Sequence, residues 1–110
     1  MNSKLLTIVA TGNKEKALAG LMFTRNAIKY RWLDNVKVVF FGPSEELVVH
    51  DERVAHMTEE IAAMTDCFAC KYVSDEQGVS EDLVEVGIRV EYVGTVISDL
   101  IKEGYVPMVW

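Results

Sequence analysis

Two segments in the first half of the chain have the pattern of strands that are buried on both faces. Residues 5–10 and residues 36–41 are almost continuously apolar, which is typical of interior strands in a parallel sheet. Between them, residues 14–30 repeat apolar side chains at helical spacing. Asn13 stands directly before that segment and can cap a helix there. The pattern therefore predicts a strand, a helix and a second strand in succession.

The second half of the chain continues this alternation. Apolar side chains at three- and four-residue steps predict a helix over residues 51–65, and a short apolar run predicts a third strand over residues 67–70. Residues 46–50 are ambiguous between a loop and a helical turn. The remaining predicted elements are a short capped helix from Ser80 to Gly87, an alternating strand over residues 88–92, a helix capped by Thr95 and closed by Gly104, and a final strand over residues 106–110.

Strand and helix alternate five times with short connections, which indicates a three-layer α/β/α sandwich with a five-stranded, mostly parallel sheet. The fourth strand alternates apolar and polar residues, as a strand with one exposed face does. The fifth contains Pro107, which has no N–H for an interior ladder. Both strands are therefore expected at edges. The order 4-3-2-1-5 places them there, whereas 2-1-3-4-5 would bury the fourth, so we predict 4-3-2-1-5.

Length and charge narrow the classes of partner. A chain of 110 residues forms a single domain (residues 1–110) with a modest core, so a homo-oligomer is expected. The net charge of −6 and the lack of a basic cluster argue against nucleic acid and against an anionic membrane. No apolar run approaches the ~20 residues of a membrane helix, and the N-terminus does not have the pattern of a signal peptide. We expect a cytoplasmic protein with reduced thiols.

Both cysteines, Cys67 and Cys70, lie in the third predicted strand. A redox disulfide is disfavoured, because three extended residues span ~10 Å while bridged alpha carbons lie within ~7 Å. The odd spacing also places the two side chains on opposite faces of the strand. Zinc is disfavoured because it needs four ligands, and only His50 and His56 could complete the set. We therefore expect no metal and no cofactor.

The remaining interpretation is a single reactive thiol. Cys70 stands at the carboxyl end of its strand, where ligands and chemistry collect in α/β sheets. Lys71 follows it, and a neighbouring cation favours the thiolate. The alternative is that both cysteines are small buried apolar residues, which is the commoner fate of free cysteine. Cys67, deeper in the strand, is assigned to the core on either interpretation.

Two other features are weaker signals. The turn at residues 11–13, before a helix, could bind an anion on free backbone amides, although such turns more often only cap the helix. Near the C-terminus, Tyr105, Met108 and Trp110 form an apolar edge that could serve as an oligomer contact.

Four motifs follow one another in the second half of the chain. They are Phe-Ala-Cys-Lys-Tyr (68–72), Gly-Val-Ser-Glu-Asp-Leu (78–83), Val-Glu-Tyr-Val-Gly-Thr-Val (90–96) and Lys-Glu-Gly-Tyr (102–105). In the first half, Val-Val-Phe-Phe-Gly-Pro occupies residues 38–43. Each motif is weak alone, but their order and spacing resemble the DsrE/DsrF-like (YchN-like) family over nearly the whole chain.

The resemblance implies a small α/β/α domain that assembles into dimers, trimers or hexamers. It also implies sulfur relay, in which the cysteine matching Cys70 accepts a persulfide sulfur from a donor protein and passes it to an acceptor. Thiolate attack on a sulfane or disulfide sulfur is the step that this needs. Loops at one end of a parallel sheet converge. The residues expected to line the site are Lys71, Thr11, Gly12, Gly42, Pro43, Gly94 and Thr95.

Two alternatives stay open. The same fold could be a non-catalytic ligand-binding or regulatory subunit, with inert cysteines and a pocket between protomers. Cys70 could also sense peroxide or redox state. The relay interpretation requires an exposed Cys70, whereas the regulatory interpretation does not.

Overall fold

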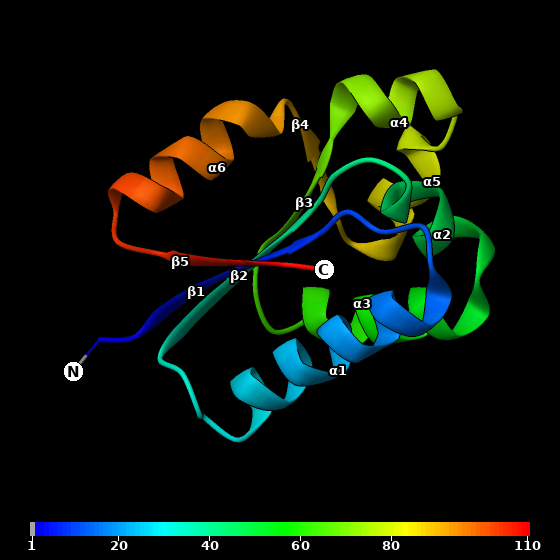
Figure 1. Cartoon of the computed structure of the whole chain (residues 1–110). Coiled ribbons are helices and arrows are strands. Elements are labelled where there is room, and N and C mark those ends of the chain that lie inside the picture. The colour runs from blue at the N-terminus through cyan, green and yellow to red at the C-terminus, as the bar shows by residue number, and fades with distance from the viewer. Residues whose placement is uncertain (1) are drawn as a thin grey trace.

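Within residues 2–110, which the computed structural model describes, five parallel strands form one sheet with helices on both faces (Figure 1). The strand order is β4-β3-β2-β1-β5. The strands are β1 (Lys4–Val9), β2 (Asn35–Phe40), β3 (Cys67–Cys70), β4 (Arg89–Glu91) and β5 (Val106–Val109). The predicted fold class and strand order are both confirmed.

The edge positions of β4 and β5 follow from their sequences. β1 and β2 bury most of their side chains and lie in the interior, whereas every residue of β5 is exposed. The N–H of Trp110 donates to the carbonyl of Ile8 at 2.8 Å. Since backbone directions alternate along a strand, the nitrogen of Pro107 faces the outer edge, away from β1. Proline therefore costs the sheet no hydrogen bond at this position.

The helices cover both faces of the sheet and occupy most of the remaining chain. Among the described residues they are α1 (Lys14–Lys29), α2 (Ser44–His50), α3 (Glu52–Ala62), α4 (Lys71–Gln77), α5 (Ser80–Val86) and α6 (Val93–Lys102). As predicted, Asn13 caps α1, accepting the N–H of Lys16 at 3.0 Å. No helix in this part of the chain is long and apolar enough to cross a membrane.

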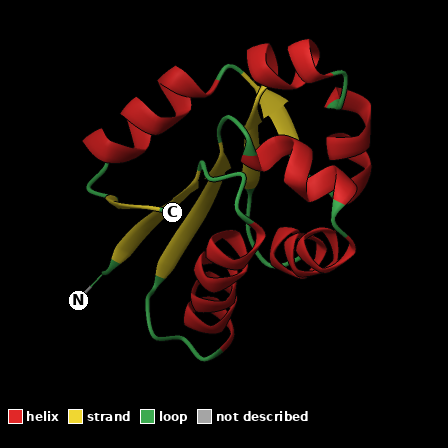
Figure 2. Cartoon of the chain, turned by 45° about the vertical axis from the view of Figure 1, so that its right-hand side comes forward, coloured by secondary structure: helices red, strands yellow, loops and turns green. Residues whose placement is uncertain are grey.

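The alternation of side chains along the strands divides the core into two parts. Val38, Phe40 and Cys67 point to the face that α1, α2, α3 and α5 cover. Val39 and Cys70 point to the other face, where α6 packs. Figure 1 shows α1 and α6 on opposite sides of the sheet, and Figure 2 shows the same separation after a 45° turn. The two cysteines therefore belong to different cores.

Some element boundaries differ from those predicted. The ambiguous residues 46–50 belong to α2, and the polar residues after Cys70 form α4, which ends at Gly78 in the left-handed conformation. α3 is shorter than predicted and ends at Ala62. Beyond it, the hydroxyl of Thr65 donates to the carbonyl of Val36 at 2.6 Å. This tertiary contact, which local pattern does not reveal, turns the chain into β3.

Two predicted helix caps are wrong. α6 begins at Val93, so Thr95 lies inside its first turn and its hydroxyl donates to the carbonyl of Tyr92 at 3.5 Å. Ser80 is the first residue of α5, and its hydroxyl donates to Asp75 Oδ1 at 2.6 Å. Hydroxyl groups can bond to any of several nearby acceptors, and the tertiary structure decides which acceptors are within reach.

Candidate functional site

The carboxyl ends of the strands meet at one end of the sheet, and Cys70 lies there. It is the last residue of β3 and the residue directly before α4. β3 pairs with β2 on one side and β4 on the other, so that Cys70 lies beside Glu91. The predicted strand-end position of Cys70 is confirmed.

The exposure of Cys70, which the sequence left open and the relay interpretation requires, is not seen in the structure. Only 7% of the residue is exposed, and it packs in the core beneath α6 with Val39, Val93 and Leu100. β3 passes into α4 without a loop, and α4 contributes Val73 to the same core. Because sequence spacing does not show how α6 lies on the sheet, it could not reveal that Cys70 is covered.

Cys67 is buried on the face of the sheet opposite to Cys70, and its thiol is unreactive. It is 0% exposed, and its thiol donates weakly to the carbonyl of Thr65 at 3.9 Å. Burial, and then the negative charge of Asp66, raise the pKa of Cys67 to about 12, although Lys37 acts in the opposite direction. Both cysteines are free thiols. Cys67 is therefore a core residue, as predicted, and it carries no thiolate at neutral pH.

Lys71 and the start of α6 lie together beside Cys70. Lys71 Nζ contacts Asp75 Oδ2 at 2.6 Å and lies 5.9 Å from the ring centroid of Tyr92. The hydrogen bond with Asp75, reinforced by its charge, raises the pKa of Lys71. Tyr92 is 64% exposed and directly precedes the first turn of α6, which contains Gly94 and Thr95. Lys71 and Tyr92 are therefore neighbours at the surface near Cys70, and Gly94 and Thr95 follow Tyr92 along the chain.

The other predicted lining residues form a second group. A Cβ atom placed on Gly12 would lie 3.0 Å from Pro43 Cβ, so these two turns are in contact. They border a cavity of about 490 Å³ whose other walls come from α2 and α4. Its lining residues are Gly12, Pro43, Glu46, Leu47, His50 and Gln77. Cys70 and Lys71 do not line this cavity, so the predicted site is divided between two neighbouring regions.

Thr11 and Gly42 belong to this second group, and both take part in its hydrogen bonds through backbone atoms. The N–H of Thr11 donates to the carbonyl of Trp110 at 3.1 Å, so the C-terminal end of the described chain occupies that amide. The carbonyl of Gly42 accepts Gln77 Nε2 at 3.5 Å. The suggested anion site on free amides at residues 11–13 is therefore partly occupied by the chain itself.

Glu45 lies between these regions, and the sequence did not single it out. It is 0% exposed and lies in the first turn of α2. Its Oε2 accepts the N–H of Gly42 at 3.1 Å. Burial raises its pKa to about 7, against the opposing effect of the backbone N–H groups of Gly42 and Cys70. In the sequence, a glutamate three residues after a turn glycine resembles a capping box. This spacing is the sequence signal from which the role of Glu45 could have been predicted.

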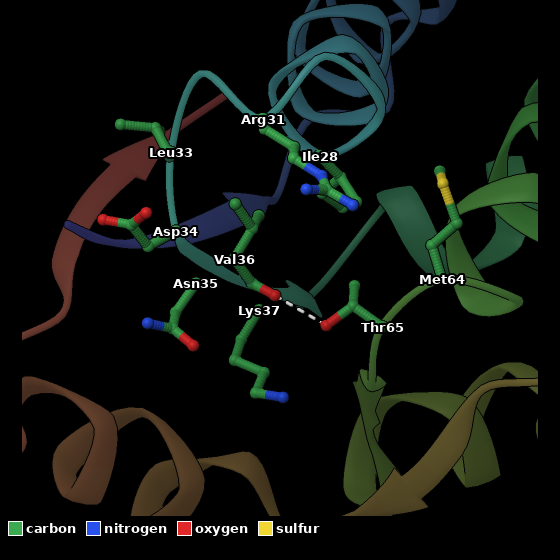
Figure 3. Close-up of a pocket in the computed structure, with 9 residues that line it drawn as sticks. All are labelled: Ile28, Arg31, Leu33, Asp34, Asn35, Val36, Lys37, Met64 and Thr65. Carbon is green, nitrogen blue, oxygen red and sulfur yellow. Dashed lines mark hydrogen bonds between the residues drawn. The ribbon is translucent and has the colours of Figure 1, made fainter. Parts of the chain in front are cut away.

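A second cavity, of about 410 Å³, lies at the amino end of β2, at the opposite end of the sheet from Cys70 (Figure 3). The end of α1 and the loop before β3 complete its walls. Its lining residues are Ile28, Arg31, Leu33, Asp34, Asn35, Val36, Lys37, Met64 and Thr65. None of the predicted site residues is among them. Within residues 2–110, no group of three or more His, Cys, Asp or Glu side chains is arranged to bind a metal.

Comparison with known proteins supports the fold. No protein-family model matches the sequence, and no curated protein matches it significantly. Among solved structures, the chain is similar to BT1422 of Bacteroides thetaiotaomicron, described as a conserved protein of unknown function. The TM-score is 0.85 at 23% identity, over 97% of this chain and 95% of that chain. It is also similar to MTH1491 of Methanobacterium thermoautotrophicum, a protein of unknown function, with a TM-score of 0.78 at 16% identity, over 99% and 100% of the two chains. At these identities the likeness establishes a shared α/β fold.

Proposed function

We propose that this chain is a small sulfur-transfer protein of the DsrE/DsrF-like kind that carries a persulfide on Cys70. The observation that carries the proposal is the position of Cys70, as the last residue of β3 at the carboxyl end of a parallel sheet. That end is where α/β proteins place reactive groups. Cys67 is not a competing nucleophile, because burial raises its pKa to about 12.

The transfer proceeds in two exchange steps. The Cys70 thiolate attacks the outer sulfur of a donor persulfide, the donor's S–S bond breaks, and the donor leaves as a thiolate. An acceptor thiolate then attacks the outer sulfur on Cys70, which regains its own thiolate. The sulfane sulfur moves between thiols in both steps, so no external oxidant or reductant is consumed.

The surroundings of Cys70 suit docking by another protein. Phe40 pairs with Ala69, so the next residue, the exposed Phe41, lies beside Cys70 at the end of the sheet. Tyr72 and Tyr92 are also exposed next to it. Exposed aromatic side chains are typical of protein contact surfaces. We propose that a sulfur donor, an acceptor or a second copy of the chain binds here, and that the setting is the cytoplasm.

Access to the thiol requires a small opening of this surface. The residues above Cys70 belong to α6 and to α4, and α4 is only seven residues long. Short elements at a surface open locally at low free-energy cost. Partner binding at Phe41, Tyr72 and Tyr92 would displace such an element and expose the sulfur.

The burial of Cys70 favours a second candidate function, a non-catalytic ligand-binding or regulatory subunit of a homo-oligomer. Free cysteine in an apolar core usually behaves as a small apolar residue. In that case we propose that the ligand binds in the cavity beside Gly12 and Pro43, where Glu46, His50 and Gln77 supply polar groups among apolar lining residues.

Thiol chemistry separates the two candidates. The protein is incubated with polysulfide and its intact mass is measured, with Cys70→Ser and Cys67→Ser as matched variants. Sulfur transfer predicts an adduct of about 32 Da, one sulfur atom, that persists in Cys67→Ser and disappears in Cys70→Ser. An adduct that is absent from the native protein, together with a Cys70 that resists alkylation, would contradict the proposal and favour the regulatory subunit. A sulfenate formed with peroxide instead would indicate redox sensing.

A further inference from the structure

The chain leaves α1 through a turn that usually requires glycine. The N–H of Arg31 donates to the carbonyl of Ile28 at 3.2 Å, and the N–H of Trp32 donates to the carbonyl of Ala27 at 2.9 Å. These two bonds form a Schellman motif, in which the first residue after the cap is left-handed and is usually glycine. Here that residue is Arg31, with a φ of 55°. Within residues 2–110 it is the only non-glycine residue with a positive φ.

Helix stability does not explain an arginine at this position. α4, α5 and α6 are each followed by a glycine with a positive φ. Arginine costs free energy in the same conformation, because its Cβ crowds the backbone. A cation near a helix C-terminus is favourable, but Lys29 in the last turn of α1 already supplies one. The fold by itself therefore gives no reason for Arg31.

The side chain of Arg31 points into the cavity of about 410 Å³ at the amino end of β2 (Figure 3). Within residues 2–110, its guanidinium group has no ion-pair partner. The carboxylate of Asp34 points away from it (Figure 3), and Asp34 Oδ2 accepts the N–H and the hydroxyl of Ser3 at 2.8 and 3.0 Å. Apolar side chains form part of the cavity wall, namely those of Ile28, Leu33, Val36 and Met64.

The charges beside the cavity leave a positive excess, although the chain as a whole has a net charge of −6. Lys37, which lines the cavity, and Arg89 both contact the carboxylate of Asp66, each at 3.4 Å. Two cations thus share one acid, and one positive charge remains unbalanced. The carbonyls of Ala27 and Ile28 at the end of α1 are already bonded by the turn, so they do not compete for the guanidinium.

We propose that this cavity binds a small organic carboxylate, which Arg31 holds through its guanidinium group while a short apolar tail of the ligand packs on the cavity wall. The site lies at the opposite end of the sheet from Cys70, and it does not depend on the proposed sulfur transfer. The left-handed backbone places Arg31 over the cavity, and the free energy that this conformation costs is the reason to assign the arginine a binding role.

A carboxylate fits these groups better than a more highly charged anion. The planar guanidinium fork matches the two oxygens of a carboxylate, and a single negative charge balances the single positive excess. The volume lies within the range of small-molecule sites. The carboxylate could belong to a free acid or to the C-terminus of a peptide, and two probes separate these sources.

The test is a titration followed by the NMR shifts of the Asn35, Val36 and Thr65 amides. The probes are butyrate, a free acid, and N-acetylvaline, which resembles a peptide C-terminus. Butylamine has the tail of butyrate with the opposite charge and is the control ligand. The variants are Arg31→Gly, Arg31→Gln and the control Lys29→Gln, which removes the same charge from the last turn of α1.

At least one of the two carboxylates should give saturable shifts, and the one that binds more tightly identifies the source. Both Arg31 variants should weaken its binding roughly tenfold or more, as expected for the loss of a charged hydrogen bond. Lys29→Gln should bind it as the native protein does. The proposal is overturned if neither carboxylate binds, if butylamine binds equally well, or if either Arg31 variant keeps the native affinity.

Stability without ligand supplies an independent readout. Glycine relieves the backbone strain, so Arg31→Gly should unfold at a higher urea concentration than the native protein while it loses the ligand. This opposite response of stability and binding is the mark of a residue kept for its side chain. A lower urea midpoint for Arg31→Gly would show that the arginine serves the fold, and it would also overturn the proposal.

Discussion

At the scale of single residues, burial rather than residue type decides the chemistry of this protein. Cys67 and Cys70 are three positions apart, yet strand alternation sends them into opposite cores. Glu45 and Glu46 are adjacent, yet one is buried and the other is exposed. Burial penalises the charged form of an acid, so it raises the pKa of both Glu45 and Cys67.

The raised pKa of Glu45 makes stability depend on pH in a definite direction. The folded state binds the Glu45 proton more tightly than the unfolded state, in which the carboxyl has a pKa near 4.5. The contribution of this proton to the free energy of unfolding is therefore fully present below pH 4.5 and is lost as pH rises to about 7. The difference between 4.5 and about 7 corresponds to roughly 3 kcal/mol.

Glu45→Gln should therefore match the native free energy of unfolding near pH 4.5 and exceed it by up to roughly 3 kcal/mol above pH 7. The amide keeps the bond from Gly42 and does not ionise. Urea unfolding of both proteins at each pH measures the difference, and Glu46→Gln is the control for net charge. A gap between Glu45→Gln and native that does not change with pH would show that Glu45 does not titrate in this range.

At the scale of elements, helix ends depend on which backbone groups are available. Asn13 caps α1 as its sequence predicts, but Thr95 and Ser80 bond to other acceptors. Glycines at helix ends were more reliable signals. Gly87 and Gly104 follow α5 and α6 with φ of 107° and 96°, a region that other residues enter only with strain.

Two glycines of α6 should respond in opposite directions to alanine. Gly94 lies in the first turn and has no atom within 4 Å of an added Cβ, whereas Gly104 is equally open but has a φ of 96°. Gly94→Ala should stabilise the protein by roughly 0.5–1 kcal/mol through helix propensity. Gly104→Ala should destabilise it by roughly 1–2 kcal/mol through backbone strain. Thermal unfolding of the two variants measures both effects.

Loss of stability in Gly94→Ala would show that Gly94 does not have the open helical environment seen here. Cys70 alkylation in the same variant serves as a second readout. An unchanged alkylation rate is expected, since the added methyl group meets no neighbouring atom.

At the scale of the whole molecule, the first and last strands, β1 and β5, lie side by side in the sheet. β5 pairs with β1, and the carbonyl of Trp110 accepts the N–H groups of Ala10 and Thr11 at 2.7 and 3.1 Å. The Trp110 ring packs on Gly20 of α1, where an added Cβ would lie 2.6 Å from a ring atom. The absence of a side chain at Gly20 thus leaves space for the Trp110 ring, which packs the end of β5 against α1.

Gly20→Ala should therefore destabilise the protein by roughly 1–3 kcal/mol, because the Trp110 ring must move. Helix propensity alone would favour alanine, so the sign of the change separates packing from propensity. Hydrogen exchange should also become faster at the amides of Ala10 and Thr11, which donate to Trp110. An exposed position on the same helix, Ala19→Ser, is the control. Stabilisation by Gly20→Ala would contradict the packing role of Trp110.

The sequence by itself determined the fold class and the strand order. Near-continuous apolar strands, the alternation of the fourth strand and Pro107 in the fifth each reflect how much of a strand is covered, and coverage depends on position in the sheet. The strand-end position of Cys70 followed from the apolar run that ends at Lys71, and the opposite direction of Cys67 followed from the period of two along a strand.

Only the tertiary structure decided what surrounds those positions. It covered Cys70 with α6, divided the predicted lining residues into two groups and buried Glu45 against the backbone of Gly42. Local pattern reports which face of an element is apolar, but it does not report which distant element packs over a given residue. That choice depends on long-range packing of α6 and α2 against the sheet, which couples residues far apart along the chain.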